Sequence, residues 1–114
     1  MRFESEVVAE EILPAVRKTI ATRLLKEYGY TQEEIAAKLD VTQPAVSQYI
    51  QGKRADSSVV QKLTDDPQID ITIDDAVSNA AQNKDFSDEI RRIVSTVRDK
   101  GLLKEKFEDA DRIM

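Results

Sequence analysis

The chain has 114 residues, of which 40% are apolar and 5% aromatic, so it can form one modest aliphatic core; its three Gly and three Pro are few for an all-β fold. It has no Cys and no His, which excludes disulfides, thiolate or imidazole metal sites, and nucleophilic catalysis that depends on either side chain. The net charge of −5 predicts weak non-specific binding to nucleic acid, and no apolar run suits a membrane span or a secretion signal. We therefore expect an all-α, cytoplasmic protein that contacts no membrane.

Residues 5–28 carry a helical apolar stripe. Apolar side chains recur at i, i+4 steps from Val8 to Leu24. Pro14 interrupts the pattern, so we expect either a kinked helix or a short helix that ends before a new one begins at Pro14. Gly29 is placed to end this helix in the left-handed conformation.

Residues 31–54, TQEEIAAKLDVTQPAVSQYIQGKR, predict two short helices joined by a tight bend. The first helix follows a capping box in which Thr31 is the N-cap and Glu34 lies three residues on. The second spans residues 42–51 and is capped by Thr42. Because the connection is so short, the two helices must cross steeply, which is the geometry of a helix-turn-helix.

Four positions support this bend. Ala36 is small where the two helices would touch, and Val41 and Val46 place apolar side chains in the angle between them. Asp40 occupies a position that often needs left-handed backbone, where Gly is commonest and Asp is enriched over most residues.

The second half predicts further amphipathic helices. A short helix is expected over residues 57–63, and a loop over residues 65–71 marks the best domain boundary, with a short strand as the weaker alternative. Thr72 then opens a helix through a second capping-box pattern. Ser87 is expected to cap the next helix, and a last amphipathic helix is expected over residues 103–114.

Charge is distributed unevenly between the two halves. Residues 17–54 contain seven basic and four acidic side chains, whereas residues 57–114 contain nine basic and thirteen acidic ones. An acidic second half does not prevent phosphate contact by a local basic patch in the first.

The stretch from Ile20 to Arg54 resembles the helix-turn-helix of phage-repressor-like regulators, also called the xenobiotic response element family. The matching residues are Gln32, Ala36, Asp40 in the Gly position, Val46 and Tyr49, with the trailing QGKR. More narrowly, EEILPAVRKTIATRLLKEYGYTQEEIA with VTQPAVSQYIQGKR is similar to small archaeal predicted transcription regulators. Regulators of that group often carry cysteines in their C-terminal part, and this chain has none, which argues against metal or redox sensing.

The resemblance implies an all-α fold in which an N-terminal repressor-like domain of four to five helices precedes C-terminal amphipathic helices. We expect residues 1–64 to bind DNA and residues 65–114 to serve dimerisation or regulation. The helix at 42–51 is then expected to enter the major groove of double-stranded DNA. The expected DNA-binding residues are Gln32, Thr42, Gln43, Pro44, Ser47, Gln48, Lys53 and Arg54.

Base contact is assigned to the outward face of the helix at 42–51. Gln43, Ser47 and Gln48 carry amides and a hydroxyl that match the donors and acceptors of base edges, and Gln pairs bidentately with adenine. Pro44 and Ala45 would touch a thymine methyl group.

Phosphate contact is assigned to residues at the rim of the bend. Gln32 is placed to contact a phosphate and to brace Gln43, while Lys53 and Arg54 add sequence-independent attraction. Each residue also has an ordinary structural explanation: a polar helix face is usually just solvated, Thr42 is first a cap, and the two basic residues suit a helix C-terminus.

The expected function is sequence-specific regulation of transcription by a homodimer on an inverted repeat, since one helix-turn-helix reads too few base pairs alone. The dimer would be held largely by the C-terminal helices, with help from residues 3–13. The alternative is an antitoxin or adaptor that binds a protein partner through its acidic C-terminal helices.

No enzyme, cofactor or metal site is indicated. The chain has no Gly-rich phosphate loop, and its acidic residues at 65–75 lack the order of an EF-hand. Asp74 and Asp75 are better explained as first-turn acids of a helix. No pattern identifies a small-molecule effector.

Overall fold

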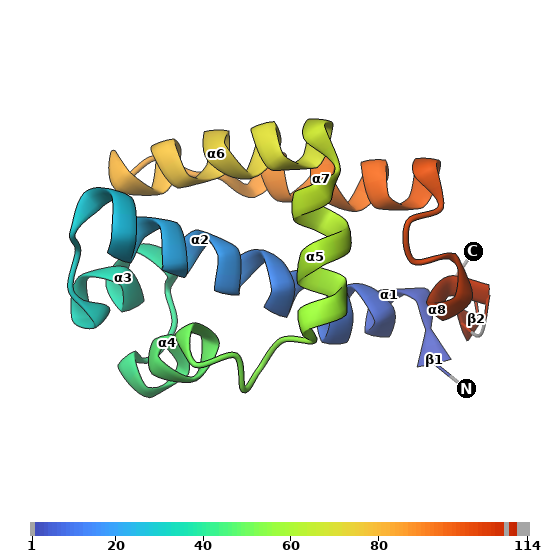
Figure 1. Ribbon diagram of the computed structural model, residues 1–114, viewed down its shortest axis with the longest axis horizontal. Coiled ribbons are helices and arrows are strands. Elements are labelled where there is room, and N and C mark those ends of the chain that lie inside the picture. The colour runs from blue at the N-terminus through green and yellow to red at the C-terminus, as the bar shows by residue number, and fades with distance from the viewer. Residues whose placement is uncertain (1, 109, 112–114) are drawn as a thin grey trace.

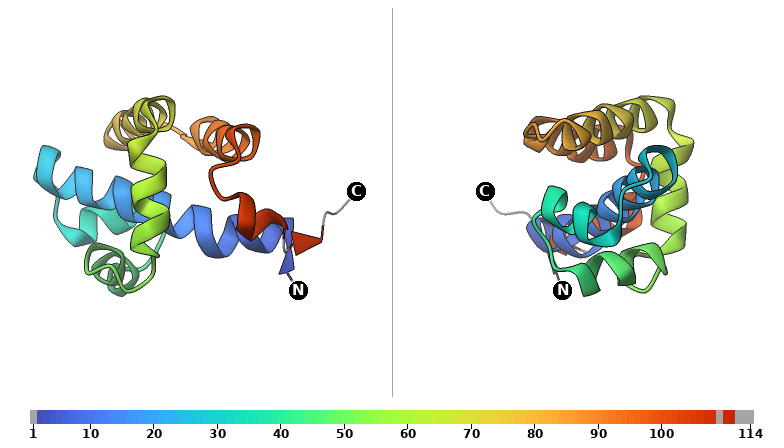
Figure 2. Two further views of the ribbon diagram at one scale, coloured as in Figure 1. Left: turned by 45° about the vertical axis from the view of Figure 1, so that its right-hand side comes forward. Right: turned by 90° about the vertical axis from the view of Figure 1, so that its left-hand side faces the viewer.

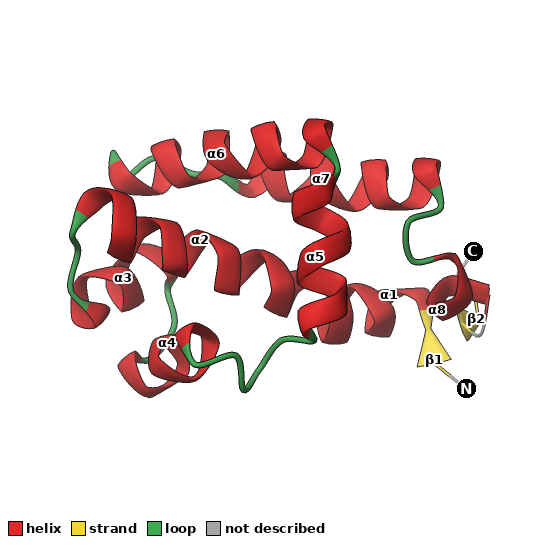
Figure 3. Ribbon diagram, in the orientation of Figure 1, coloured by secondary structure: helices red, strands yellow, loops and turns green. Residues whose placement is uncertain are grey.

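The protein, in a computed structural model that describes residues 2–108 and 110–111, is built almost entirely of helices (Figures 1 and 3). The elements in chain order are β1 (Arg2–Phe3), α1 (Glu4–Val7), a π-helical segment η1 (Val8–Ile12), α2 (Leu13–Tyr28), α3 (Gln32–Leu39), α4 (Gln43–Ile50), α5 (Ser57–Asp65), α6 (Pro67–Ala81), α7 (Ser87–Lys100), α8 (Lys104–Glu108) and β2 (Ala110–Asp111). The predicted all-α class is confirmed; within the described residues, the exception is a two-residue parallel pairing of β1 with β2.

Helix α2 is the centre of the molecule. On one side of it lie α3 and α4, on the other lies α6, which pairs with α7, and α5 runs across from the first layer to the second (Figures 1 and 2). One hydrophobic cluster joins these layers, since fully buried Ile20 and Leu24 of α2 belong to the same core as Ile69 and Ile73 of α6. The segment before residue 65 and the segment after it therefore share one core.

Pro14 lies in a continuous helical run rather than at a break. The helix changes to π geometry over Val8–Ile12 and returns to α geometry at Leu13. A proline removes one backbone donor, and its ring clashes with the carbonyl four residues earlier in a regular α-helix. A wider turn immediately before Pro14 relieves that conflict, which is why the expected break is instead a local change of helix type.

The expected loop over residues 65–71 is wrong. Helix α6 begins at Pro67, and Asp66 is its N-cap: the Asp66 carboxylate accepts a hydrogen bond of 3.0 Å from the Ile69 backbone N–H. Thr72 therefore lies inside the helix, where its hydroxyl donates to the Gln68 carbonyl, and it caps nothing. The buried Ile69 side chain anchors this early start in the core.

The acidic residues of α6 make specific contacts. Asp74 and Asp70 both pair with Arg23 of α2, so Asp74 is not the first-turn acid that the sequence predicted. Asp66 pairs with Lys100 at 2.9 Å, which ties the start of α6 to the end of α7. Across the described ranges no group of three or more carboxylates is placed to hold a metal ion.

The C-terminal part departs from the expected last helix over residues 103–114. Helix α7 spans Ser87–Lys100 and has Phe86 at its N-cap position, so the prediction that Ser87 caps this helix is wrong. The helix ends before Gly101, whose φ of 66° is left-handed. Helix α8 then covers only Lys104–Glu108, and Ala110–Asp111 pairs with β1 instead of continuing the helix. Residues 109 and 112–114 lie outside the described part. In the part that is described, no helix has both the length and the apolar character that a membrane span requires.

Candidate nucleic-acid interface

The first helix of the bend is fixed by the predicted capping box, which is confirmed. The backbone N–H of Glu34 donates to the hydroxyl of Thr31 at 3.1 Å, and the Thr31 N–H donates to the Glu34 carboxylate at 3.0 Å. The hydrogen bond from the Thr31 backbone N–H, followed by one from the Thr31 side chain, lowers the pKa of the exposed Glu34 because both favour its charged carboxylate. The start of α3 is therefore set by residues next to it in the sequence.

The bend itself has the predicted geometry. Asp40 adopts left-handed backbone with φ 55° and ψ 47°, and the Val41 N–H donates to the Ala36 carbonyl at 3.1 Å. Ala36 is only 7% exposed and Val46 is fully buried, so both lie in the contact between α3 and α4. The small side chain at position 36 lets the helices approach at a steep angle.

Helix α4 divides into a buried and an open face. Thr42 caps it by accepting from the Ala45 N–H at 3.2 Å, and Ala45, Val46 and Tyr49 are buried. Ala45 therefore cannot touch a thymine methyl group, because its methyl group faces the core. The side chains left on the open face are those of Gln43, Pro44, Ser47 and Gln48, the last two being half-buried.

The amide side chains on this face are held by neighbours. The Gln43 Nε2 donates to the Gln32 Oε1 at 2.7 Å, so the predicted brace from α3 is confirmed. The Gln51 Nε2 donates to the Ser47 hydroxyl at 3.0 Å. Each bond fixes one side chain and uses a defined part of its hydrogen-bonding capacity.

Gln48 is held through a longer chain of contacts. The Arg54 Nε donates to the Gln48 Oε1, and the Arg54 guanidinium lies 5.7 Å from the centre of the Tyr49 ring. Behind them, the Arg17 Nη1 of α2 lies 3.5 Å from the Tyr49 hydroxyl. Arg17 was not among the predicted site residues, because a contact across 32 positions leaves no local pattern in the sequence.

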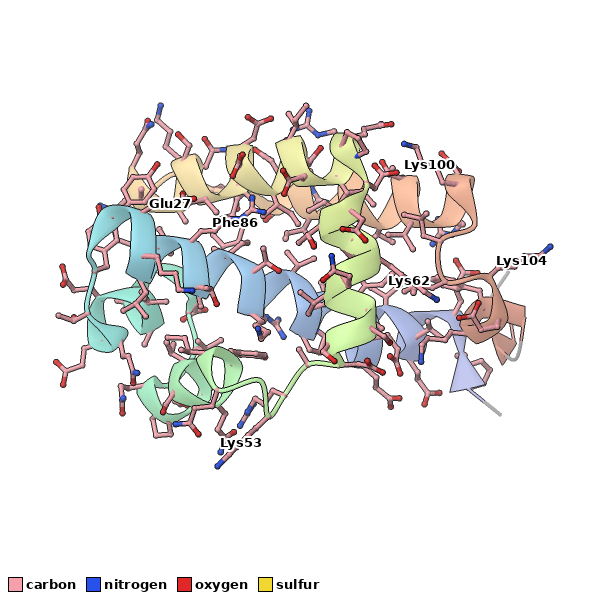
Figure 4. All side chains as sticks on the ribbon, viewed as in Figure 1. Glu27, Lys53, Lys62, Phe86, Lys100 and Lys104 are labelled. Atoms are coloured by element: carbon pink, nitrogen blue, oxygen red, sulfur yellow. The ribbon has the colours of Figure 1, made fainter. Side chains whose placement is uncertain are left out.

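Lys53 is separate from this network. Gly52 turns the chain with φ 78°, and the Lys53 backbone N–H donates to the Gln48 carbonyl at 2.9 Å. The Lys53 side chain extends away from the body beyond the end of α4 (Figure 4). A Cβ atom built at Gly52 would lie 3.7 Å from the Lys18 side chain of α2, so a second lysine borders the same turn.

Four of the eight predicted residues form two hydrogen-bonded pairs. Gln32 and Gln43 bond across the bend, and Gln48 bonds with Arg54 past the end of α4. The remaining predicted residues lie along α4 and at its ends. All of them are exposed or half-buried, which leaves the face accessible to a large partner.

The comparisons with known proteins agree with this geometry. The helix-turn-helix family model matches residues 22–73, a range that contains α3, the bend, α4 and α5 in full. No curated protein and no solved structure matches the chain. Domains of this family bind DNA in transcription regulators and are not catalytic. Residues 22–73 of this chain are therefore similar to the phage-repressor-like, or xenobiotic-response-element-like, helix-turn-helix family.

Proposed function

We propose that this protein is a sequence-specific regulator of transcription that places α4 in the major groove of double-stranded DNA. The observation that carries the proposal is the pair of braced amides, Gln43 with Gln32 and Gln48 with Arg54, on the open face of a short helix. On a face that only contacts water, fixing these side chains brings no binding advantage. On a face that contacts bases, it favours binding because the side chains are already ordered and lose less conformational entropy when DNA binds.

Gln43 is proposed to read adenine. One of its two N–H groups is used by Gln32, which leaves the Gln43 carbonyl oxygen and the other N–H available. Adenine presents a donor at N6 beside an acceptor at N7 in the major groove, which complements that pair. The bond to Gln32 would hold the amide plane in the orientation that bidentate pairing needs.

Gln48 is proposed to read a base edge that presents acceptors. Arg54 uses one of the two lone pairs of the Gln48 carbonyl oxygen, whereas both amide N–H groups are left to donate to DNA. Guanine presents N7 and O6 as adjacent acceptors, and thymine presents O4. Ser47 has the same preference, because its oxygen accepts from Gln51 and its own hydrogen is free to donate.

Phosphate contacts would position the domain without reading sequence. We assign them to Lys53, to the guanidinium nitrogens of Arg54, to Gln32, and to Thr42 with the backbone N–H of Gln43 at the start of α4. Pro44 has no N–H and would pack against a thymine methyl group.

A homodimer on an inverted repeat is proposed because a single α4 reaches only a few base pairs. Two copies would set their α4 helices about 34 Å apart along one face of the duplex. Segment 65–114 is assigned to this contact, and Val94 of α7, a half-buried apolar side chain at the molecular surface, is a candidate contact residue.

The dimer is tested on the full chain, because α6 belongs to the core and cannot be removed. Light scattering should show a dimer for the wild type and for Ser95→Lys, which changes an exposed neighbour on α7. Val94→Lys should give a monomer that circular dichroism shows to be helical. A dimer in both variants would place the contact elsewhere.

The DNA assignment is tested by selecting bound duplexes from a random pool at about 0.15 M salt, where non-specific binding is weak. The expected product is a palindrome with half-sites about 10 base pairs apart, each containing an adenine and a neighbouring guanine or thymine. If folded protein enriches no motif, the proposal that this chain alone reads DNA is wrong.

A further inference from the structure

A groove separates α2 from α7, although both helices pack on α6. It has a volume of about 330 Å³ and lies between Leu13 and Ile20 of α2 and Ile90 of α7, with Phe86 at the start of α7. Phe86 lies between the α6–α7 pair and α2 (Figure 4). The volume is within the usual range for sites that enclose a small organic molecule, roughly 300 to 1,000 Å³.

The charge of the groove is one-sided. Arg17 and Arg91 are its charged lining residues, and among the described residues no carboxylate lines it. Arg91 also pairs with Asp88 at 2.7 Å, but both side chains are mostly exposed, so water and salt screen this pair. Arg17 is half-buried, and a guanidinium in such a place binds a carboxylate with charge-assisted hydrogen bonds.

We propose that this groove binds a small amphipathic monocarboxylate as an effector. Its apolar body would lie between Leu13, Phe86 and Ile90, and its carboxylate would meet Arg17 at one side and Arg91 at the other. A carboxylate suits a groove in which two guanidiniums and Ser87 accompany apolar side chains, whereas a neutral apolar molecule would give the guanidiniums no charged partner.

The groove reaches the DNA-binding elements by two routes. The Arg17 Nη1 lies 3.5 Å from the Tyr49 hydroxyl. The Arg54 guanidinium lies over the Tyr49 ring, and its Nε donates to the Gln48 side chain. A ligand carboxylate bound to Arg17 would compete with the contact between Arg17 and the Tyr49 hydroxyl. The expected consequence is a looser Gln48 and weaker DNA binding. This second step rests on the function proposed above, but binding in the groove does not.

The second route passes through the bend. Leu39, the last residue of α3, lines the groove and also lines a neighbouring polar pocket of about 520 Å³ that contains Asp40. Lys38, which lines the same pocket beside Leu39, donates from its Nζ to the Asn83 side chain at 3.0 Å and to the Ala81 carbonyl at 3.3 Å. An occupant that moves α7 relative to α2 therefore acts on the end of α3.

Binding is tested by calorimetry on the full chain without DNA, with 3-phenylpropanoate as the probe and 3-phenylpropanamide as its neutral counterpart. The acid should bind at one site per chain, and the amide about tenfold more weakly or not at all. Arg91→Gln should weaken binding of the acid, whereas Arg92→Gln, the same change one position further along α7, should not. Equal binding of acid and amide, or equal effects of the two variants, would overturn the proposal.

Occupancy of the groove is tested separately with Ile90→Trp, which fills it. The variant should lose probe binding while light scattering gives the same mass as for the wild type. If the wild type binds no probe and Ile90→Trp changes the oligomeric state, a second copy of the chain occupies this groove and the ligand proposal is wrong.

Coupling is read by NMR, also without DNA. Saturating 3-phenylpropanoate should shift the side-chain amide signals of Gln48 and the Nε signal of Arg54, and should leave those of Gln68 on α6 unchanged. Probe binding with no change at Gln48 would overturn the effector role. Calorimetry and NMR both work without DNA, so they test ligand binding in the groove even if the random-pool selection fails. The groove proposal and the DNA-binding proposal can therefore fail separately.

Discussion

Arg23 of α2 lies 2.6 Å from the carboxylate of Asp74 on α6, and its second terminal nitrogen contacts Asp70 one turn earlier. Partial burial by itself would lower the pKa of Arg23, but the hydrogen bonds and charges of Asp70 and Asp74 outweigh it and raise the pKa. The Arg23 side chain is 19% exposed and that of Asp74 is 58% exposed, so water screens much of this interaction. It joins the helix beneath the DNA-binding elements to the second half of the chain.

The first prediction concerns this pair. Asp74→Asn should lower the free energy of unfolding by less than about 1 kcal/mol, because the pair is largely solvated and Asp70 remains. Arg23→Ala should cost about 1–3 kcal/mol, because it removes both bonds and leaves Asp70 and Asp74 close together. Urea denaturation monitored by circular dichroism measures both. Asp75→Asn, an exposed neighbour with no contact to Arg23 in the structure, is the control and should be near neutral.

The second prediction concerns DNA affinity at the selected site. Gln48→Ala should cost about 1–3 kcal/mol there and relax preference at one base pair. Because Arg54 holds Gln48, the loss caused by Arg54→Ala should be smaller in the Gln48→Ala background than in the wild type. Fluorescence anisotropy on the specific and a scrambled duplex measures the cycle.

Lys53→Ala is the control for that cycle. It should weaken both duplexes alike and reduce the salt slope by about 1, as loss of a phosphate contact does. Additive effects of Gln48→Ala and Arg54→Ala would show that the Gln48–Arg54 contact does not persist on DNA.

The third prediction concerns the contact between α3 and α4. Ala36→Leu should lower the free energy of unfolding by about 1–3 kcal/mol, since the larger side chain must push the two helices apart. Ala37→Leu places the same side chain on the exposed side of α3 and should change stability by at most about 0.5 kcal/mol. Equal effects of the two substitutions in thermal unfolding would contradict the packing described for Ala36.

The fourth prediction is a pH dependence at Asp66. The hydrogen bond from Lys100, followed by that from the Ile69 N–H, lowers the pKa of Asp66 from its ordinary value of 3.8. A carboxyl group whose pKa is lower in the folded state stabilises the fold above pH 3.8, and this contribution is lost as the pH falls toward the folded-state pKa. Asn also caps helices well, so Asp66→Asn mainly removes the charge.

The measurement for Asp66 is the melting temperature of both proteins between pH 7 and pH 2. The wild type should melt at a higher temperature than Asp66→Asn at pH 7, and the difference should shrink below pH 3.8. A difference that stays constant down to pH 2 would show that the charge of Asp66 does not act as described.

The helix-turn-helix was predictable because its signals are local. Thr31 with Glu34, Asp40 in the bend and Thr42 before α4 each act within four residues, and all have the predicted geometry. The bond between Gln32 and Gln43 followed once the bend was placed, because a tight turn brings the starts of the two helices together.

The errors lie where two local signals compete. Thr72 and Asp75 form a capping-box pattern, but Asp66 followed by Pro67 forms an earlier start, and the buried Ile69 favours the earlier one. Sequence spacing alone does not show which of the two caps starts the helix. Burial of Ile69 in the core shared with α2 decides it. In the same way, the contacts of Arg17 and Arg23 join residues more than 30 positions apart and depend on how the helices pack.

The core shared by α2 and α6 also has a consequence for how the chain unfolds. Because Ile69 and Ile73 complete the cluster around Ile20 and Leu24, the DNA-binding helices cannot melt independently of α6. Hydrogen exchange should then show one cooperative unit that spans both halves, rather than an N-terminal unit that outlasts the rest. A destabilising substitution in α6 would therefore lower the concentration of DNA-competent protein without touching any residue that faces DNA.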